Sequence, residues 1–193
     1  MHMKTINLLY NKYKNSPFTY SEAIEAGVTR HTFNVLLKNN DIMRIHKNIY
    51  VLAAGDITEE DIFKGILRYL GKPSIICLLS ALSYYDLIDV IPKKTWVFVP
   101  EKKQSSRKDI RLIRTKHLNW DIGVIYKNGF YITSLERTLV DSLVYQKKLG
   151  LQIAVSALKK ALKEKQTTLN KVYDIAKKLK LEGKIEQYIK VLM

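Results

Sequence analysis

Two neighbouring stretches decide the fold at the front of this chain: Gly27–Lys38, which reads GVTRHTFNVLLK, and Ile42–Leu52, which reads IMRIHKNIYVL. Thr29 is a favoured helix N-cap, and the apolar residues after it recur at helical spacing, so the sequence predicts a helix over 30–38. The second stretch contains two β-prone runs on either side of the polar turn 46–48, which predicts a β-hairpin.

The residues before Gly27 extend this unit toward the N-terminus. Residues 3–14 carry apolar side chains at helical intervals, which predicts a first helix. A short second helix is predicted over 22–26 with Ser21 as its N-cap, and the glycine that follows suits a tight turn. The order of helix, helix, turn, helix and hairpin is that of a winged helix-turn-helix, which we predict for residues 1–54.

The predicted third helix keeps a polar face that points outward, and this face suits DNA. Arginine matches a guanine edge, asparagine an adenine edge and lysine a phosphate, and the start of a helix attracts phosphate. Some three-helix modules use such a face to bind protein instead, but the polar turn of the hairpin favours DNA. The candidate DNA-binding residues are Thr29, Arg30, His31, Thr32, Asn34 and Lys38 on the helix and Arg44, His46, Lys47 and Asn48 on the hairpin.

The chain is strongly basic, with 33 Lys and Arg against 18 Asp and Glu and a net charge of +15. Such an excess favours an anionic partner such as nucleic acid, although a generally lysine-rich composition is the alternative. Residues 143–193 carry twelve basic and four acidic side chains, so the tail is the most basic part. Lys159, Lys160 and Lys163 there form either a second phosphate-contacting surface or a solvated helix face.

The remainder, residues 55–193, is predicted as a second, mixed domain, which makes the whole chain α+β. Thr58 begins a helix that ends near Gly71, and a further helix is predicted over 74–87. Strand-like runs predict a small sheet within 95–132, and amphipathic patterns predict helices through 133–193. Thr133 and Glu136 have the spacing of a capping box at the start of this helical part.

The stretch Thr133–Asp141, TSLERTLVD, resembles the "TS-x-E-RT-LVD" motif of AbiEi-type antitoxins, which belong to type IV toxin–antitoxin and abortive-infection systems. The front stretch Arg44–Tyr50, RIHKNIY, and the segment Ser80–Leu82 resemble the same family, so the likeness spans nearly the whole chain. One departure is Asn48, where the family often has glycine. Asparagine tolerates the left-handed backbone conformation that such a turn requires.

This resemblance implies a two-domain antitoxin whose front domain binds inverted repeats of double-stranded DNA in its own promoter and represses the operon. It also implies that the rear domain counteracts a nucleotidyltransferase-like toxin without a stable complex. The motif residues that the resemblance identifies are Ser80, Glu136, Arg137, Thr138 and Asp141. Because Arg137 and Asp141 are four residues apart on a predicted helix, we favour a structural ion pair over a direct functional role.

No catalytic, metal-binding or cofactor-binding motif stands out, so we expect neither an enzyme nor a cofactor or metal. The single cysteine, Cys77, lies in an apolar run and is predicted to be buried, which fits a reducing cytoplasm. No apolar run reaches the roughly 18 residues of a membrane-spanning helix, so no membrane partner is expected. Two alternatives remain: a regulator that responds to a small ligand, and a metal-dependent nuclease that uses Asp86 or Asp89 with Glu101-Lys102-Lys103.

Overall fold

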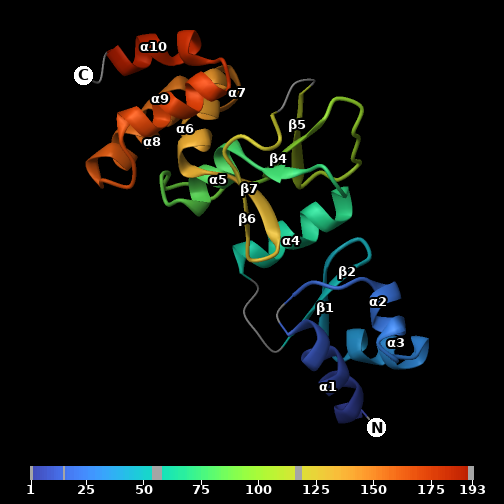
Figure 1. The fold of residues 1–193 in the computed structure, drawn as a ribbon. Coiled ribbons are helices and arrows are strands. Elements are labelled where there is room, and N and C mark those ends of the chain that lie inside the picture. Colours follow the sequence, from blue (N-terminus) through green and yellow to red (C-terminus); the bar gives the residue numbers. More distant parts are fainter. Residues whose placement is uncertain (1, 15, 54–57, 116–118, 191–193) are drawn as a thin grey trace. The chain divides into compact units, whose positions relative to one another are not determined.

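The computed structural model describes residues 2–14, 16–53, 58–115 and 119–190, and it divides the chain into two compact units, Met1–Gly71 and Lys72–Met193. Figure 1 traces both units from the N-terminus to the C-terminus. The fold is α+β, as predicted from the sequence. No helix in the described ranges is both long and apolar enough to span a bilayer.

The first unit consists of helices around one antiparallel hairpin. Its core is built from apolar side chains of every element from α1 to β2, among them Leu9, Phe18, Phe33 and Tyr50. The order of elements up to the hairpin is the predicted one. The elements are α1 (His2–Tyr13), α2 (Tyr20–Glu25), α3 (Arg30–Lys38), β1 (Ile42–His46), β2 (Ile49–Leu52) and α4 (Glu59–Leu70).

The second unit is a five-stranded mixed sheet, in the order β5-β4-β3-β7-β6, with helices packed on it. Helix α6 is central to the helical part, because it packs against α5, α8, α9 and α10. Figure 1 shows α6 to α10 gathered together. The elements are β3 (Ile75–Ile76), α5 (Leu78–Tyr84), β4 (Thr95–Pro100), β5 (Ile110–Thr115), β6 (Val124–Lys127), β7 (Phe130–Thr133), α6 (Leu135–Val144), α7 (Gln146–Leu149), α8 (Leu151–Lys163), α9 (Leu169–Lys178) and α10 (Glu182–Lys190).

The prediction of one helix over 74–87 is wrong at its start. Ile75 and Ile76 form the short central strand β3, which pairs antiparallel with β4 and parallel with β7. Both side chains are buried. A run of apolar residues fits a buried strand as well as a buried helix, and only pairing with distant segments selects the strand.

Two of the predicted helix caps are also wrong, each by one or two residues. Helix α2 is capped by Thr19, which forms a capping box with Glu22, rather than by Ser21. Helix α6 is capped by Ser134, whose hydroxyl accepts a hydrogen bond from the Arg137 N–H at 3.2 Å. Thr133 is instead the last residue of β7, since it pairs with Val124.

The predicted boundary at residues 54 and 55 falls in 54–57, outside the described residues. The two compact units divide later, after Gly71, so that α4 belongs to the first unit. Arg68 joins α4 to the rest of this unit, because it donates a hydrogen bond to the Pro17 carbonyl at 2.6 Å and forms an ion pair with Glu22.

Candidate nucleic-acid interface

Helix α3 presents one apolar and one polar face. Phe33 and Leu36 are buried in the core of the first unit. Arg30, Asn34 and Lys38 lie four residues apart along the helix, and all three are exposed. Spacings of four residues place side chains on one face of a helix, so these three form a polar ridge about two turns long.

The first turn of α3 is held by hydroxyl groups rather than left open. The Thr29 hydroxyl accepts a hydrogen bond from the Thr32 N–H at 3.2 Å, and the two hydroxyl oxygens lie 2.9 Å apart. Thr29 is therefore a cap, as predicted from its position before the helix. His31 and Thr29 are exposed and Thr32 is partly exposed, so the predicted residues of this turn all reach the surface.

The hairpin places further polar residues in the same unit. Arg44, Lys47 and Asn48 are exposed, whereas the side chain of His46 lies outside the described part. Asn48 has a φ of 59°, the left-handed conformation that its position in the turn predicts. Its side-chain oxygen accepts a hydrogen bond from the Tyr20 N–H at 3.4 Å, which links the turn to the start of α2.

Aromatic side chains fix the hairpin against α3. The Phe33 ring packs edge-on against the Tyr50 ring and the Tyr20 ring, with centroids 4.8 and 4.9 Å apart. Phe18 and Tyr50 exchange two backbone hydrogen bonds of 2.8 and 2.9 Å, so β2 is tied to the segment before α2. Because both elements share these contacts, the polar ridge and the hairpin turn hold a defined relation to each other. The sequence pattern predicts the elements but not this aromatic arrangement.

Only part of the candidate second basic surface is available to a phosphate. Lys159 and Lys163 on α8 are exposed. The Lys160 ammonium instead lies 3.6 Å from an Asp86 carboxylate oxygen and 3.7 Å from one of Asp89. Two carboxylates beside Lys160 reduce its attraction for a phosphate.

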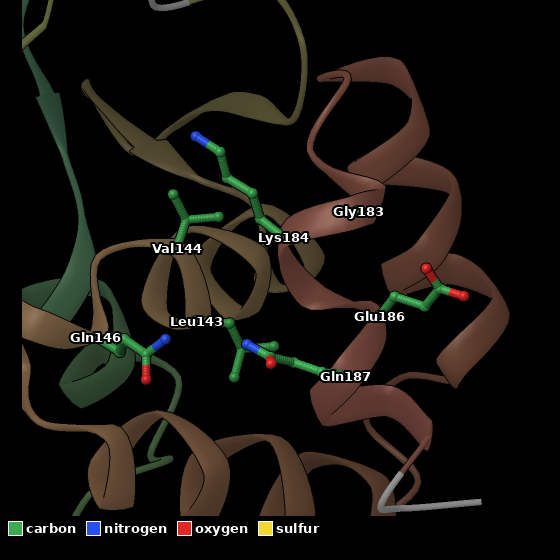
Figure 2. Close-up of a pocket in the computed structure, with 7 residues that line it drawn as sticks. All are labelled: Leu143, Val144, Gln146, Gly183, Lys184, Glu186 and Gln187. Carbon is green, nitrogen blue, oxygen red and sulfur yellow. The ribbon is translucent and has the colours of Figure 1, made fainter.

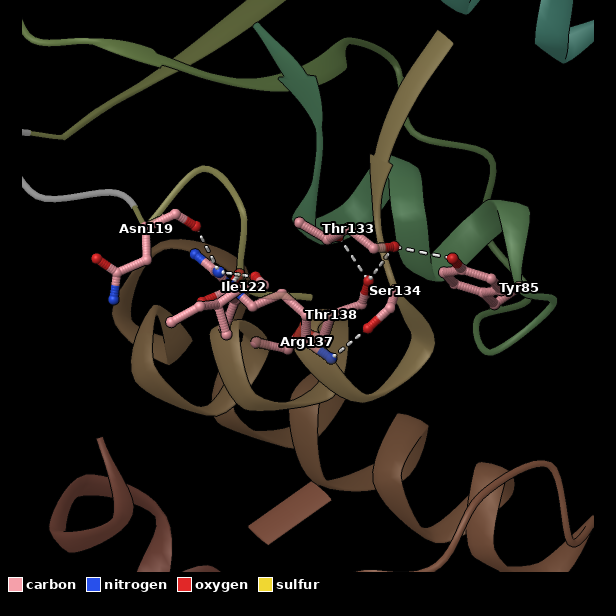
Figure 3. Close-up of polar contacts among 9 residues, drawn as sticks. Tyr85, Asn119, Ile122, Thr133, Ser134, Arg137 and Thr138 are labelled. Atoms are coloured by element: carbon pink, nitrogen blue, oxygen red, sulfur yellow. Dashed lines mark hydrogen bonds and ion pairs between the residues drawn. The ribbon is translucent and has the colours of Figure 1, made fainter. Parts of the chain in front are cut away.

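The motif around Arg137 forms a buried network at the start of α6 (Figure 3). Arg137 and Asp141 are almost fully buried, and the guanidinium Nε donates to the carboxylate at 2.7 Å. Nη1 donates to the Asn119 carbonyl at 3.2 Å and to the Ile122 carbonyl. Arg137 thus fastens the 119–122 loop onto α6, which is a structural role.

The other motif residues also hold elements together. The hydroxyl oxygens of Thr133 and Thr138 lie 2.7 Å apart, and the Ser80 hydroxyl accepts a hydrogen bond from the Trp96 N–H at 2.9 Å. Glu136 accepts a hydrogen bond from the Thr167 hydroxyl at 2.8 Å. Some of these bonds join segments that are distant in the sequence, and the others join β7 to α6. The motif therefore stabilises the second unit.

Burial raises the pKa of several titratable groups in or beside this network, among them Asp141 and Cys77. Burial raises the pKa of Asp141 to about 6, an effect that the neighbouring Arg137 partly offsets. Burial also raises the pKa of the Cys77 thiol well above its usual value, with the Asp141 carboxylate adding to the effect. Cys77 is buried, as predicted, and a thiol with a raised pKa is a poor nucleophile.

The residues of the nuclease alternative do not assemble a metal site. Glu101 and Lys102 are exposed in the turn after β4, whereas Asp86 and Asp89 both lie beside Lys160 on α8. Within the described ranges, no group of three or more His, Cys, Asp or Glu side chains is arranged to hold a metal ion.

A polar hollow of about 450 Å³ lies between α6, α7 and α10. Leu143 and Val144 contribute apolar surface, and Gln146, Lys184 and Gln187 contribute polar groups, while Glu186 points away from the others (Figure 2). The Gln146 amide nitrogen hydrogen-bonds the Tyr188 hydroxyl. The sequence contains no spacing that would have predicted this hollow, because its lining comes from segments about forty residues apart.

No protein-family model matches this chain, and no curated protein matches it. Among solved structures, the crystal structure of the RV2827C protein from Mycobacterium tuberculosis is similar, with a TM-score of 0.50 and 12% sequence identity. The alignment covers 93% of this chain and 75% of that chain. At this identity the likeness concerns the fold alone.

Proposed function

We propose that the first unit is a winged helix-turn-helix that binds double-stranded DNA, with α3 as the recognition helix and the β1–β2 hairpin as the wing. The observation that carries the proposal is the exposed ridge of Arg30, Asn34 and Lys38 on a helix whose opposite face is buried. The major groove of DNA admits one α-helix, and a polar ridge of this length reaches several base pairs.

The chemistry of each side chain suggests its contact. Arg30 offers two parallel donors to a guanine edge, and Asn34 offers a donor and an acceptor to adenine. Lys38 and Lys47 supply charge to phosphates, which positions the protein without reading sequence. Arg44 at the hairpin suits the backbone or the minor groove.

On the basis of the sequence resemblance, we further propose that the protein is an antitoxin and autorepressor. In this proposal the first unit binds inverted repeats in its own promoter. The second unit counteracts a nucleotidyltransferase-like toxin without a stable complex and without being an enzyme. The Arg137 network supports a structural role for the resembling motif, so we assign the neutralising activity to the unit as a whole and not to these residues.

Binding to the DNA upstream of the protein's own gene tests the first proposal. We expect Arg30→Ala to lower affinity for this DNA and to relax discrimination at one base position by about 1–3 kcal/mol. Arg111→Ala, which removes an exposed arginine of the second unit, is the matched control and should bind as the wild type does. Equal binding by wild type and Arg30→Ala in fluorescence anisotropy would contradict the role of α3.

Growth rescue tests the antitoxin proposal separately. The downstream gene is expressed alone or with the protein, and we expect the protein to restore growth. An Arg30→Ala, Asn34→Ala double variant should lose repression of a promoter reporter and still restore growth, because its second unit is unchanged. If the wild type represses the reporter but does not restore growth, the protein is a repressor and not an antitoxin.

The polar hollow favours a second candidate, a DNA-binding regulator that responds to a small polar ligand. Its volume lies in the range of small-molecule sites, roughly 300–1,000 Å³, and Lys184 offers a cation to an acidic ligand. Thermal shift with a panel of amino acids, nucleotides and carboxylic acids tests it, with Lys184→Met expected to abolish any shift. The exposed Lys178 provides the control variant Lys178→Met. The absence of any shift across the panel would count against this candidate.

A further inference from the structure

The loop between α5 and β4 exposes two consecutive branched apolar side chains. Val90 is 72% exposed and Ile91 is 86% exposed. Single exposed apolar residues are ordinary, but a contiguous group marks an interaction surface. Ile153 on α8, 37% exposed, extends the apolar surface beyond the loop.

An apolar hollow of about 410 Å³ lies beside these side chains. Its apolar lining is contributed by the α5–β4 loop, by α5 and by α8, and it includes Leu79, Leu87, Ile88, Val90, Pro92 and Ile153. Ile91 is not among the residues that line it. The surface therefore combines the projecting apolar side chain of Ile91 with a neighbouring apolar hollow.

Contacts within the second unit hold the first part of this loop, residues 86–89, in position. The Asp86 N–H donates to the Ser83 carbonyl at 2.9 Å, and the Leu87 N–H donates to the Leu82 carbonyl at 2.8 Å. Lys160 of α8 lies within 3.7 Å of the carboxylates of Asp86 and Asp89. Because these contacts hold the first part of the loop before any partner arrives, they lower the conformational entropy that docking costs.

We propose that this loop and α8 form a self-association surface for a second copy of the chain, with Ile91 of each copy seated in the hollow of the other. A two-fold interface uses the same patch on both copies, so it requires a projection and a matching hollow side by side. This patch has both.

Charge supports a second copy as the occupant. A net charge of +15 opposes self-association, so a patch that carries both signs is a favourable place for a second copy to dock. The side chains of Asp86 and Asp89 are 88% and 97% exposed, and Lys93 and Lys94 are exposed on the same loop. Across a two-fold axis, the carboxylates of one copy can face the ammonium groups of the other.

Sedimentation velocity of the full-length protein tests the proposal from about 1 μM to about 1 mM, which spans stable to transient association. We expect a dimer that grows with concentration in the wild type and is lost in Ile91→Asp. Ile125→Asp is the matched control, because Ile125 is another exposed isoleucine, 37% exposed, that lies on β6, and it should dimerise as the wild type does. Circular dichroism checks that both variants fold. A wild type that stays monomeric throughout, or an Ile91→Asp variant that dimerises normally, would overturn the proposal.

A cross-link tests the geometry. Chains with Ile91→Cys are mixed with chains with Ile153→Cys, and oxidation should join residue 91 of one chain to residue 153 of the other. The native Cys77 is buried, so it does not compete. Replacing Ile91→Cys by Ile125→Cys supplies the control pair. If the two mixtures form equal amounts of cross-linked dimer, the proposed seat of Ile91 is wrong.

Discussion

At the scale of single residues, Gly123 and Arg137 depend closely on each other. Gly123 has a φ of 61°, and a Cβ atom placed on it would lie 2.7 Å from the Arg137 Cβ. Its carbonyl also accepts a hydrogen bond from the Ser134 N–H at 2.8 Å. The glycine therefore allows the loop to approach α6 closely enough for the arginine to reach the loop carbonyls.

We predict that Gly123→Ala destabilises the protein by about 2–4 kcal/mol, through backbone strain and overpacking against Arg137. Gly183→Ala is the matched control, because a Cβ there meets no atom within 4 Å and the residue lies in α10. Alanine is the better helix former, so this control should be neutral or stabilising by up to about 1 kcal/mol. Urea unfolding measures both variants, and equal effects would contradict the close contact.

The buried Asp141 predicts a specific pH dependence of stability. Its pKa is raised to about 6 in the folded protein, above the ordinary value near 4 in the unfolded chain. Between these values the folded state holds a proton that the unfolded state has released, so stability falls as the pH rises from about 4 to about 6. Below this window, both states are protonated and the stabilising effect is complete.

Comparison with Asp141→Asn isolates this effect, since asparagine does not titrate. We expect the wild type to lose about 3 kcal/mol of unfolding free energy relative to Asp141→Asn across this window, and no more above it. The exposed Asp174, replaced in Asp174→Asn, serves as the control. Chemical denaturation at several pH values provides the measurement. A difference that stays constant, or that grows in favour of the wild type with pH, would show that folding does not raise the pKa of Asp141.

At the scale of elements, helix α2 shows how caps set a boundary. Thr19 accepts a hydrogen bond from the Glu22 N–H at 3.2 Å, and the Glu22 carboxylate accepts one from the Thr19 N–H at 2.8 Å. This reciprocal pair begins the helix at Tyr20, ahead of Ser21. Glu22 also pairs with Arg68 of α4, so the same side chain joins two helices.

We predict that Thr19→Ala costs about 1 kcal/mol of stability, because the first turn of α2 loses its cap. Ser21→Ala should change stability by less than about 0.5 kcal/mol, since Ser21 is exposed within the helix. Thermal or urea unfolding of the two variants decides between the caps. If Ser21→Ala lowered the stability more than Thr19→Ala, the cap of α2 would be Ser21 and not Thr19.

At the scale of the whole molecule, the charge is distributed unevenly over the two units, and the tail is the most basic part. Charge alone does not identify the proposed DNA-binding surface, because Lys160 of the second unit already lies beside two carboxylates. In the first unit, in contrast, the exposed Lys38 lies on the polar ridge of α3 and the exposed Lys47 lies in the hairpin turn. If the first unit binds DNA as proposed, the dependence of affinity on salt should come mainly from there.

Salt titration of DNA binding tests this distribution. Each phosphate contact contributes about 0.9 to the slope of log affinity against log salt concentration. We expect Lys38→Gln with Lys47→Gln to reduce the slope by up to about 1.8, and the Lys159, Lys160 and Lys163→Gln triple variant to leave it unchanged. A reduced slope in the triple variant would instead make α8 a second DNA-binding surface.

The sequence by itself determined the local elements of the first unit. The bounds of α3 are those that Thr29 and the helical spacing predict, and the left-handed Asn48 is where the turn predicts it. Caps, turn residues and short-range periodicity act within a few residues, so their effects can be read from a short stretch of sequence. The i,i+4 pair of Arg137 and Asp141 was predictable for the same reason.

Only the tertiary structure decided the features that join distant segments. Strand β3 exists because Ile75 and Ile76 pair with β4 and β7, and Arg137 acts through carbonyls of the 119–122 loop. The hollow beside Ile91 likewise combines the α5–β4 loop with α8. Such contacts depend on which segments meet in space, and an apolar or charged residue in a sequence does not specify its distant partner.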